Sequence, residues 1–262
     1  MDKFKANPYN PKNKLIESND IINIMKTLNI NDFSINNLSL YQTAFVHKSY
    51  CPMFDYEEFI NDNNDLPLQN TSYETMEFLG DSILSSTVSS YLYERFYEIH
   101  GENEGFLTKL RTRIVCGENL AKLSAELNLN KFIIISKHIE DNCSGRSNQH
   151  ILEDVFEAFL GAIYLDNDYE FSKKIILRII EMLVDFTDLI INDNNYKDQI
   201  QKYCQHNFKT KPLYEYLRKD DNNIFYCNLN VNDITITGEG KTKKKAEQDA
   251  SKKTLIYYNV LT

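Results

Sequence analysis

The side chains best suited to chemistry are carboxylates among apolar residues, in the stretches 73–84 (YETMEFLGDSIL) and 151–165 (ILEDVFEAFLGAIYL). They are Glu74, Glu77, Asp81, Asp154 and Glu157. Within each stretch they are three or four residues apart, the spacing of side chains on one face of a helix. An ionised carboxylate among apolar neighbours is unstable unless a cation pairs with it. Neither stretch contains Lys or Arg, so a cation from elsewhere is expected.

The expected cations are divalent metal ions shared by the two stretches, which must then be helices that face each other. Ligand groups made of carboxylate oxygens, without Cys or His, favour Mg²⁺ or Mn²⁺ over zinc. The alternative interpretation is that each acidic group is a solvated surface. The apolar neighbours of both groups disfavour that alternative.

Composition excludes several classes of protein. The chain of 262 residues fits one large or two modest domains. Its five cysteines are scattered without a CxxC pair, which argues against a disulfide framework and indicates a reducing compartment. No stretch approaches the roughly 18 apolar residues of a membrane span, and residues 1–14 do not resemble a secretory signal. We expect no membrane partner and a cytoplasmic location, which for a viral protein means the host cytoplasm.

The pattern of apolar residues predicts two domains. The expected divisions are a flexible arm at 1–15, an all-α body at 16–191, a linker at 192–195 (NDNN) and a second module at 196–262. In the body, helical spacing predominates and alternation of the β type is absent. A helix is predicted over 73–97 with Ser72 as its N-cap, and a loop over 138–148.

The second module differs from the body in charge and in pattern. Of a net charge of −9, residues 195–262 carry 12 Lys and Arg against 8 Asp and Glu, so +4 lies here and −13 in residues 1–194. A helix over 196–207, three strands and a last helix give the order α-β-β-β-α. Thr242 is expected to cap the last helix, and Ala246 and Ala250 to let it lie close to the sheet.

Four lysines crowd the start of that last helix. They are Lys241, Lys243, Lys244 and Lys245. Free N–H groups at a helix start favour anions, and lysines add positive charges that suit phosphate. The alternative is a solvated lysine cluster without a ligand.

At these residues the sequence resembles a known family. ETMEFLGDS (74–82) is similar to the signature of the ribonuclease III family, which is close to ERLEFLGDA. AFVHKSY (44–50), EGFLTKLRTRIV (104–115) and ILEDVFEAFLGAIYLD (151–166) continue the similarity in the family's order. Residues 196–258, with YKDQIQ, PLYEY and GEGKTKKKAEQDA, resemble a double-stranded-RNA-binding domain.

The resemblance implies a homodimeric, Mg²⁺-dependent endoribonuclease that cuts double-stranded RNA, with Mn²⁺ as a substitute and no small-molecule cofactor. It implies 5′-phosphate and 3′-hydroxyl ends with short 3′ overhangs. On it, Asp81 and Glu157 are catalytic, and the metal-binding acids are Glu77, Asp81, Asp154 and Glu157. Glu74 and Glu104 are supporting acids, and Phe78 inserts into the partner subunit. The implied RNA contacts are Gln201, Lys202, Lys241, Lys243, Lys244 and Lys245.

The sequence departs from the family pattern in three places. Thr75 replaces the usual arginine, and the segment 51–72 is longer than in compact relatives. KDDNN (219–223) lacks the GPxH-like text that enters a minor groove, so a weaker grip is expected there. Two other functions stay open: a non-cleaving protein that binds or sequesters double-stranded RNA, and a Mg²⁺-dependent nucleotide pyrophosphatase. Retention of the acids disfavours the first, and the basic module disfavours the second.

Overall fold

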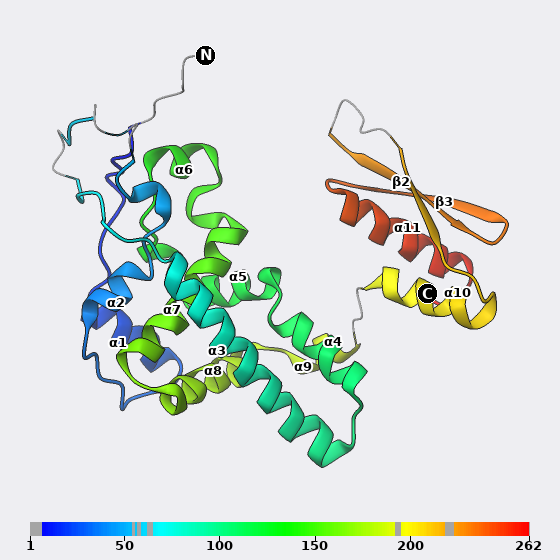
Figure 1. Cartoon of the computed structure of the whole chain (residues 1–262), viewed down its shortest axis with the longest axis horizontal. Coiled ribbons are helices and arrows are strands. Elements are labelled where there is room, and N and C mark those ends of the chain that lie inside the picture. The colour runs from blue at the N-terminus through cyan, green and yellow to red at the C-terminus, as the bar shows by residue number, and fades with distance from the viewer. Residues whose placement is uncertain are drawn as a thin grey trace. The chain divides into compact units, whose positions relative to one another are not determined.

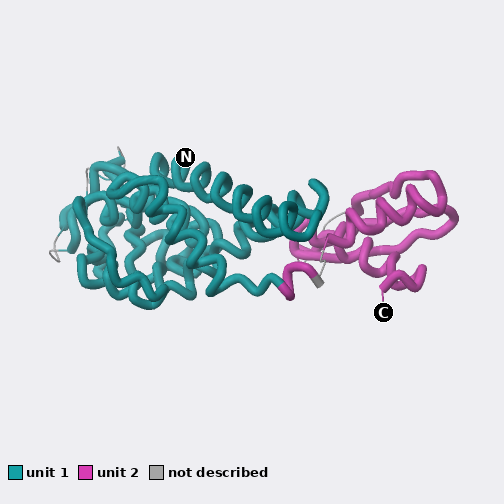
Figure 2. Tube along the Cα trace, turned by 90° about the horizontal axis from the view of Figure 1, so that it is seen from below, with its two compact units in different colours: residues 1–186 teal, residues 187–262 magenta. Residues whose placement is uncertain are grey.

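A computed structural model describes residues 7–53, 56, 59–61, 65–191, 195–217 and 223–261. The chain divides into two compact units, residues 1–186 and 187–262 (Figure 2). Residues 1–6 of the expected arm, much of the long segment 51–72, the linker residues 192–194 and the loop residues 219–222 lie outside the described part. The expected domain boundaries stay a prediction.

The first unit is helical, as expected. Its elements are α1 (Ser18–Thr27), α2 (Leu38–Thr43), α3 (Glu74–Leu92), α4 (Glu104–Ile114), α5 (Gly117–Glu126), α6 (Lys137–Asn142), α7 (Gln149–Asp166) and α8 (Tyr169–Leu183), and α9 (Phe186–Ile191) follows them. Short turns of 3₁₀ helix include η1 (Lys48–Tyr50). Among the described residues of this unit, β pairing is confined to an isolated parallel bridge between Val46 and Ile134.

Two local predictions about this unit are wrong. Tyr73, not Ser72, occupies the N-cap of α3, and the Ser72 hydroxyl instead contacts the Glu74 carboxylate at 3.4 Å. The predicted helix over 73–97 is α-helical as far as Leu92 and continues as a wider π-helical turn (η3, Tyr93–Glu98). The second wrong prediction is a loop. The expected loop at 138–148 contains α6 because the side chain of Ser136 accepts the N–H of Ile139 and caps that helix.

Helices α3 and α7 lie side by side in the middle of the first unit (Figure 1). A Cβ atom added to Gly80 would lie 1.8 Å from the carbonyl oxygen of Glu157. A Cβ atom added to Gly161 would lie 2.3 Å from the carbonyl oxygen of Met76. Glycine therefore permits the backbones to touch at two points, and this contact fixes which faces of the two helices meet.

Residues 8–13 are bound to the body, so the expected flexible arm is wrong for this segment. The side-chain amide of Asn13 donates to the carbonyl of Ile135 at 2.9 Å, and its oxygen accepts the N–H of Ile135 at 3.2 Å. Asn10, only 2% exposed, donates to the same carbonyl. The two asparagines thus act as a strand edge would, because they satisfy both backbone groups of a buried residue.

Asp166 at the end of α7 holds the start of α2. Its carboxylate accepts the N–H groups of Asn36 and Asn37 at 3.1 and 2.6 Å and the Tyr41 hydroxyl at 2.9 Å. We expect Asp166→Ala to lower the free energy of unfolding by about 3 kcal/mol, because three donors lose their acceptor in a largely buried site. Urea denaturation measures this. Asp141→Ala, which removes an exposed partner of Lys137, is the control and should leave stability unchanged.

The second unit has the expected α-β-β-β-α order. It consists of α10 (Tyr196–Asn207), β1 (Leu213–Tyr216), β2 (Phe225–Val231), β3 (Ile234–Gly240) and α11 (Lys243–Tyr257). The strands form an antiparallel sheet in the order β1-β2-β3, and α11 lies along it (Figure 1). Cys227, Leu229 and Val231, at alternate positions of β2, are buried on one strand face.

Close packing of α11 on the sheet follows from small residues. A Cβ atom on Gly238 would lie 2.2 Å from the backbone nitrogen of Ala250 and 2.4 Å from the carbonyl oxygen of Ala246. The Thr242 side chain accepts the N–H of Lys245 at 3.2 Å, which confirms the predicted cap. The helix start is therefore fixed, with its lysines on the exposed side.

Candidate active site and RNA interface

The contact between α3 and α7 gathers the predicted carboxylates. Glu157 is 9% exposed, and burial, followed by repulsion from Asp81, Glu153 and Glu77, raises its pKa to about 8. Burial and then repulsion from Asp154 and other acids raise the pKa of Glu77 to about 7. The structure thus brings Glu77, Asp81, Asp154 and Glu157 into one electrostatic group, as the spacing predicted. Because their pKa values are raised, Glu77 and Glu157 bind a proton or another cation readily.

Two of these acids have hydrogen-bond partners within the protein. Tyr73 is only 1% exposed, and its hydroxyl donates to Asp154 Oδ2 at 2.9 Å. The Ser85 hydroxyl donates to Asp81 Oδ1 at 3.3 Å. Among the described residues, no group of three or more His, Cys, Asp and Glu side chains is arranged to hold a metal ion. The carboxylates are therefore electrostatic neighbours without forming a closed ligand shell.

The chemistry of this group fits a divalent cation. The donors are carboxylate oxygens, and no Cys or His belongs to the set of four. Burial also raises the pKa of Asp154, which like Glu77 and Glu157 lacks enough positive charge around it. A hard divalent ion would relieve this repulsion.

Sequence reasoning missed three residues of this neighbourhood. Burial and then Asp154 raise the pKa of Glu153, and its charge acts on both Glu77 and Glu157. Lys48 pairs with Glu74 at 2.9 Å, and this hydrogen bond holds the pKa of Glu74 below its usual value. Tyr73 is the third. Lys48 and Tyr73 make contacts to residues far apart in sequence, whereas Glu153 lies beside Asp154 within the stretch 151–165.

Glu104 and Phe78 lie at other places on the same unit. Glu104 is exposed in the first turn of α4, where its carboxylate accepts the Thr108 hydroxyl at 2.9 Å. It lines a small hollow with Ser89 near the far end of α3, eight residues beyond Asp81. Phe78 is 77% exposed and so does not belong to the core of this chain. The roles assigned to both residues stay predictions.

The lysines at the start of α11 form the second candidate site. Lys241, Lys243, Lys244 and Lys245 are all exposed. Lys243 Nζ lies 5.1 Å from the centre of the Tyr216 ring, which places one of these charges over β1. The Tyr216 hydroxyl donates to Glu247, which also pairs with Lys197 at 2.6 Å. The buried Glu247 thus ties α10, β1 and α11 together beneath the basic surface.

The predicted contacts on α10 are also exposed. Gln201 and Lys202 both lie on the solvent side of the helix, and Lys202 pairs with Asp198 at 2.7 Å. The predicted weak point of the grip, KDDNN at 219–223, lies outside the described residues except for Asn223. The roles of Gln201 and Lys202 in RNA binding stay predictions.

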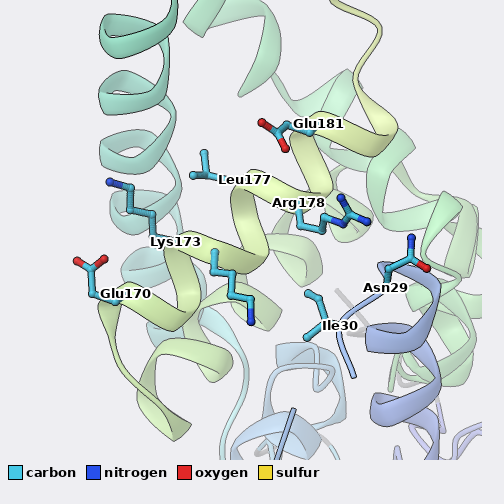
Figure 3. Close-up of a pocket in the computed structure, with 8 residues that line it drawn as sticks. Asn29, Ile30, Glu170, Lys173, Leu177, Arg178 and Glu181 are labelled. Carbon is cyan, nitrogen blue, oxygen red and sulfur yellow. The ribbon is translucent and has the colours of Figure 1, made fainter. Parts of the chain in front are cut away.

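A cavity of about 550 Å³ lies beside α8, and none of the clustered acids lines it. Its walls are Asn29, Ile30, Glu170, Lys173, Lys174, Leu177, Arg178 and Glu181 (Figure 3). Lys174 pairs with Asp32 at 2.8 Å, and Arg178 donates to the carbonyl of Leu28 at 2.9 Å. Since these basic groups already have partners, the cavity is not an evident anion site.

The fold and the two sites define a class: a helical unit with an acidic centre, followed by an α-β-β-β-α module with a basic helix start. Within the described residues, no helix is long and apolar enough to cross a membrane. Residues 37–183 match the family described as Ribonuclease-III-like, and residues 196–258 match the double-stranded RNA binding motif. The chain belongs to the ribonuclease III family of endoribonucleases.

Individual relatives support this membership. Ribonuclease 3 of Clostridium acetobutylicum is 37% identical over 84% of this chain and 90% of its own length. Ribonuclease 3 of Staphylococcus haemolyticus is 33% identical over 86% of this chain and 87% of its own. A probable ribonuclease 3 of Acanthamoeba polyphaga mimivirus is 32% identical over 99% of this chain, which spans 48% of that relative's length.

The chain is also similar to a solved structure. The nuclease domain of ribonuclease III from Campylobacter jejuni is 32% identical, with a TM-score of 0.49, and the match covers 63% of this chain and 98% of that one. The expected family, fold class and enzyme class are confirmed by the family matches and the relatives.

Proposed function

We propose that this protein is a Mg²⁺-dependent endoribonuclease that hydrolyses phosphodiester bonds of double-stranded RNA. The observation that carries the proposal is the buried carboxylate Glu157, repelled by four neighbouring acids, in a chain that also has a double-stranded-RNA-binding module. A binding protein has no need for such an unfavourable group of charges. The mimivirus relative is about twice as long as the match, so the activity of the whole protein is part of the proposal.

In this function Glu77, Asp81, Asp154 and Glu157 would hold Mg²⁺, with Mn²⁺ as a substitute. The bound ion would supply an activated water and relief of negative charge on the phosphate. Asp81 and Glu157 would act most directly, while the Tyr73 hydroxyl orients the Asp154 carboxylate. Glu74 and Glu104 would support the site from its edge.

The second unit would bind A-form RNA through its phosphates and 2′-hydroxyls, with little reading of bases. Lys241, Lys243, Lys244 and Lys245 would contact phosphates from the capped start of α11, and Gln201 and Lys202 would contact RNA from α10. Electrostatic contacts of this kind release bound counterions, so affinity falls as salt rises.

Two copies of the chain would cut the two strands. In a symmetric dimer each protomer presents an identical site, which suits the antiparallel strands of a duplex. An aromatic side chain as exposed as Phe78 is suited to a subunit interface. The expected products have 5′-phosphate and 3′-hydroxyl ends with short 3′ overhangs.

Light scattering at several concentrations tests the dimer, and a stable monomer would contradict it. The cytoplasmic location remains a prediction.

Cleavage of a labelled perfect RNA duplex, with and without Mg²⁺, tests the proposal directly. Cutting that requires Mg²⁺ is the expected result, and end analysis of the products checks the proposed overhangs. A duplex that is bound but stays whole would favour the non-cleaving binding protein. Hydrolysis of free nucleoside triphosphates in place of RNA would favour the pyrophosphatase alternative.

The lysines of α11 can be tested by salt dependence. Lys243→Ala combined with Lys244→Ala is expected to reduce the slope of log affinity against log salt by about two units, because two phosphate contacts are lost. Electrophoretic mobility shifts in Ca²⁺ measure the slope. Lys122→Ala with Lys137→Ala is the control, since these lysines pair with acids on their own helices. An unchanged slope in the double variant would remove both residues from the interface.

A further inference from the structure

Lys48 stands at the edge of the acidic group on α3 and α7. Its ammonium lies 2.9 Å from Glu74 Oε1, and its side chain is 63% exposed. The negative charges of Glu74, Asp154 and Glu77 together act on this ammonium. Lys48 is therefore a positive group that belongs to the acidic site and is also open to solvent.

The backbone that carries Lys48 is held firmly. Lys48 is the first residue of the 3₁₀ turn η1, where His47 Nδ1 accepts the N–H of Ser49 at 3.1 Å. The Ser49 hydroxyl accepts the N–H of Ser136 at 3.1 Å and lies 2.8 Å from His47 Nδ1. The N–H of Tyr73 donates to the carbonyl of Val46 at 2.8 Å, which joins the preceding residues to the start of α3.

This arrangement combines a fixed turn with a solvent-exposed side chain. His47 and Ser49 are at least partly buried, whereas the lysine stem extends from the turn into solvent. A lysine has four rotatable carbon links, so its ammonium can change partner while its backbone stays in place. An exposed ion pair is worth little free energy, and the cost of separating Lys48 from Glu74 is small.

The negative charge around Lys48 is reduced when a divalent cation enters the acidic site. Without the ion, the carboxylates attract the ammonium and repel RNA phosphates. With the ion, two added positive charges compete for Glu74 and repel the ammonium. An RNA phosphate that arrives at the acidic site then offers Lys48 a new anionic partner close to its present one.

We propose that Lys48 is a phosphate-binding residue that exchanges Glu74 for the RNA backbone when a divalent cation occupies the acidic site. The proposal rests on the function proposed above and adds a substrate contact within the first unit. It also assigns Glu74 a role: it holds the Lys48 ammonium at the site until the ion and the RNA are both bound.

The test is the salt dependence of duplex binding by the full chain, measured in Ca²⁺ and in EDTA. Lys48→Met keeps the apolar stem and removes the charge. We expect it to reduce the log–log slope by about one unit in Ca²⁺ and to leave the slope in EDTA unchanged. Lys48→Arg should keep the slope of the unaltered chain. Lys137→Met is the matched control, because Lys137 pairs with Asp141 at 2.7 Å with similar exposure.

A second measurement follows the exchange without RNA. Binding of Mn²⁺ to the protein alone, monitored by electron paramagnetic resonance, should be about threefold tighter in Lys48→Met, because a competing positive charge is gone. Glu74→Gln should raise the salt slope in EDTA towards the value in Ca²⁺, and adding Lys48→Met should cancel that rise. A lysine that only stabilised the fold would produce neither effect.

The proposal is overturned if Lys48→Met lowers the salt slope of duplex binding equally in Ca²⁺ and in EDTA, or does not lower it in Ca²⁺. Weaker Mn²⁺ binding by Lys48→Met would also overturn it. None of these readouts requires cleavage. If the unaltered chain fails to cut RNA in Mg²⁺ but Lys48→Met shows the metal-dependent slope, the proposed catalysis is wrong and the phosphate contact stands. If cleavage is observed without that slope, catalysis stands and the contact is wrong.

Discussion

A chain with Glu157→Gln is expected to leave a long RNA duplex uncut in Mg²⁺ while binding it as tightly as the unaltered chain in Ca²⁺ or EDTA. The amide keeps the shape of the side chain but removes the charge that would hold the metal. Loss of a group that only orients a metal ligand already costs about 10–100-fold, so loss of a direct ligand should exceed about 100-fold in the single-turnover rate.

Although Glu157→Gln should abolish cleavage, it should raise the free energy of unfolding at high pH. This gain distinguishes loss of a metal ligand from damage to the fold. The pKa of Glu157 is raised from its ordinary value to about 8, so ionisation of this group opposes folding. Its favourable contribution is complete below the ordinary pKa and is lost as the pH rises through about 8. In EDTA, Glu157→Gln should therefore be more stable than the unaltered chain at about pH 9, with a smaller difference at acidic pH.

Urea denaturation at the two pH values, beside a single-turnover cleavage assay, measures both effects. Glu126→Gln is the matched control, since this exposed acid pairs with Lys122 and lies in α5. It should cut RNA normally and show no such pH-dependent gain. Cleavage by Glu157→Gln at the rate of the unaltered chain would contradict its assigned role.

The second large effect is expected from Gly80→Ala. The added methyl group would lie 1.8 Å from the carbonyl oxygen of Glu157, far inside any tolerated contact, and the obstacle is backbone that cannot rotate away. Helices α3 and α7 must separate, so we expect a loss of about 3 kcal/mol or more in the free energy of unfolding. Cleavage should also be lost, because the obstructing carbonyl belongs to a residue of the acidic site.

Gly105→Ala provides the comparison for this prediction. Gly105 lies in the first turn of α4, where an added Cβ atom would meet only the side-chain oxygen of Asn103, at 3.2 Å. Alanine is also the better helix former, so stability should be close to that of the unaltered chain. Thermal denaturation of both variants decides the matter. Similar melting temperatures for Gly80→Ala and Gly105→Ala would show that the helix contact tolerates a methyl group.

The acidic site was predictable from sequence because its residues break a local rule. Asp154 and Glu157 interrupt an apolar helix, and a charge in that setting needs a partner wherever the chain folds. The order of helices and strands in the second unit followed from the change in apolar period.

Other features depend on contacts that no local pattern contains. Lys48 and Glu74 are 26 residues apart, and Tyr73 and Asp154 are 81 apart. The start of α3 was placed wrongly because Ser72 is a good cap in isolation, whereas the burial of Tyr73 sets where the chain enters the helix. Such choices are made by tertiary packing, which outweighs local preference.

The attachment of Asn10 and Asn13 to Ile135 affects how the protein can be shortened. Deletion up to residue 13 would strip the N–H and carbonyl of a fully buried residue of the partners they have in the structure. The segment around Ile135 already pairs with Val46 on its other side. A shortened chain would thus expose a bare strand edge, which invites other molecules to add to it, and its first symptom would be self-association during storage.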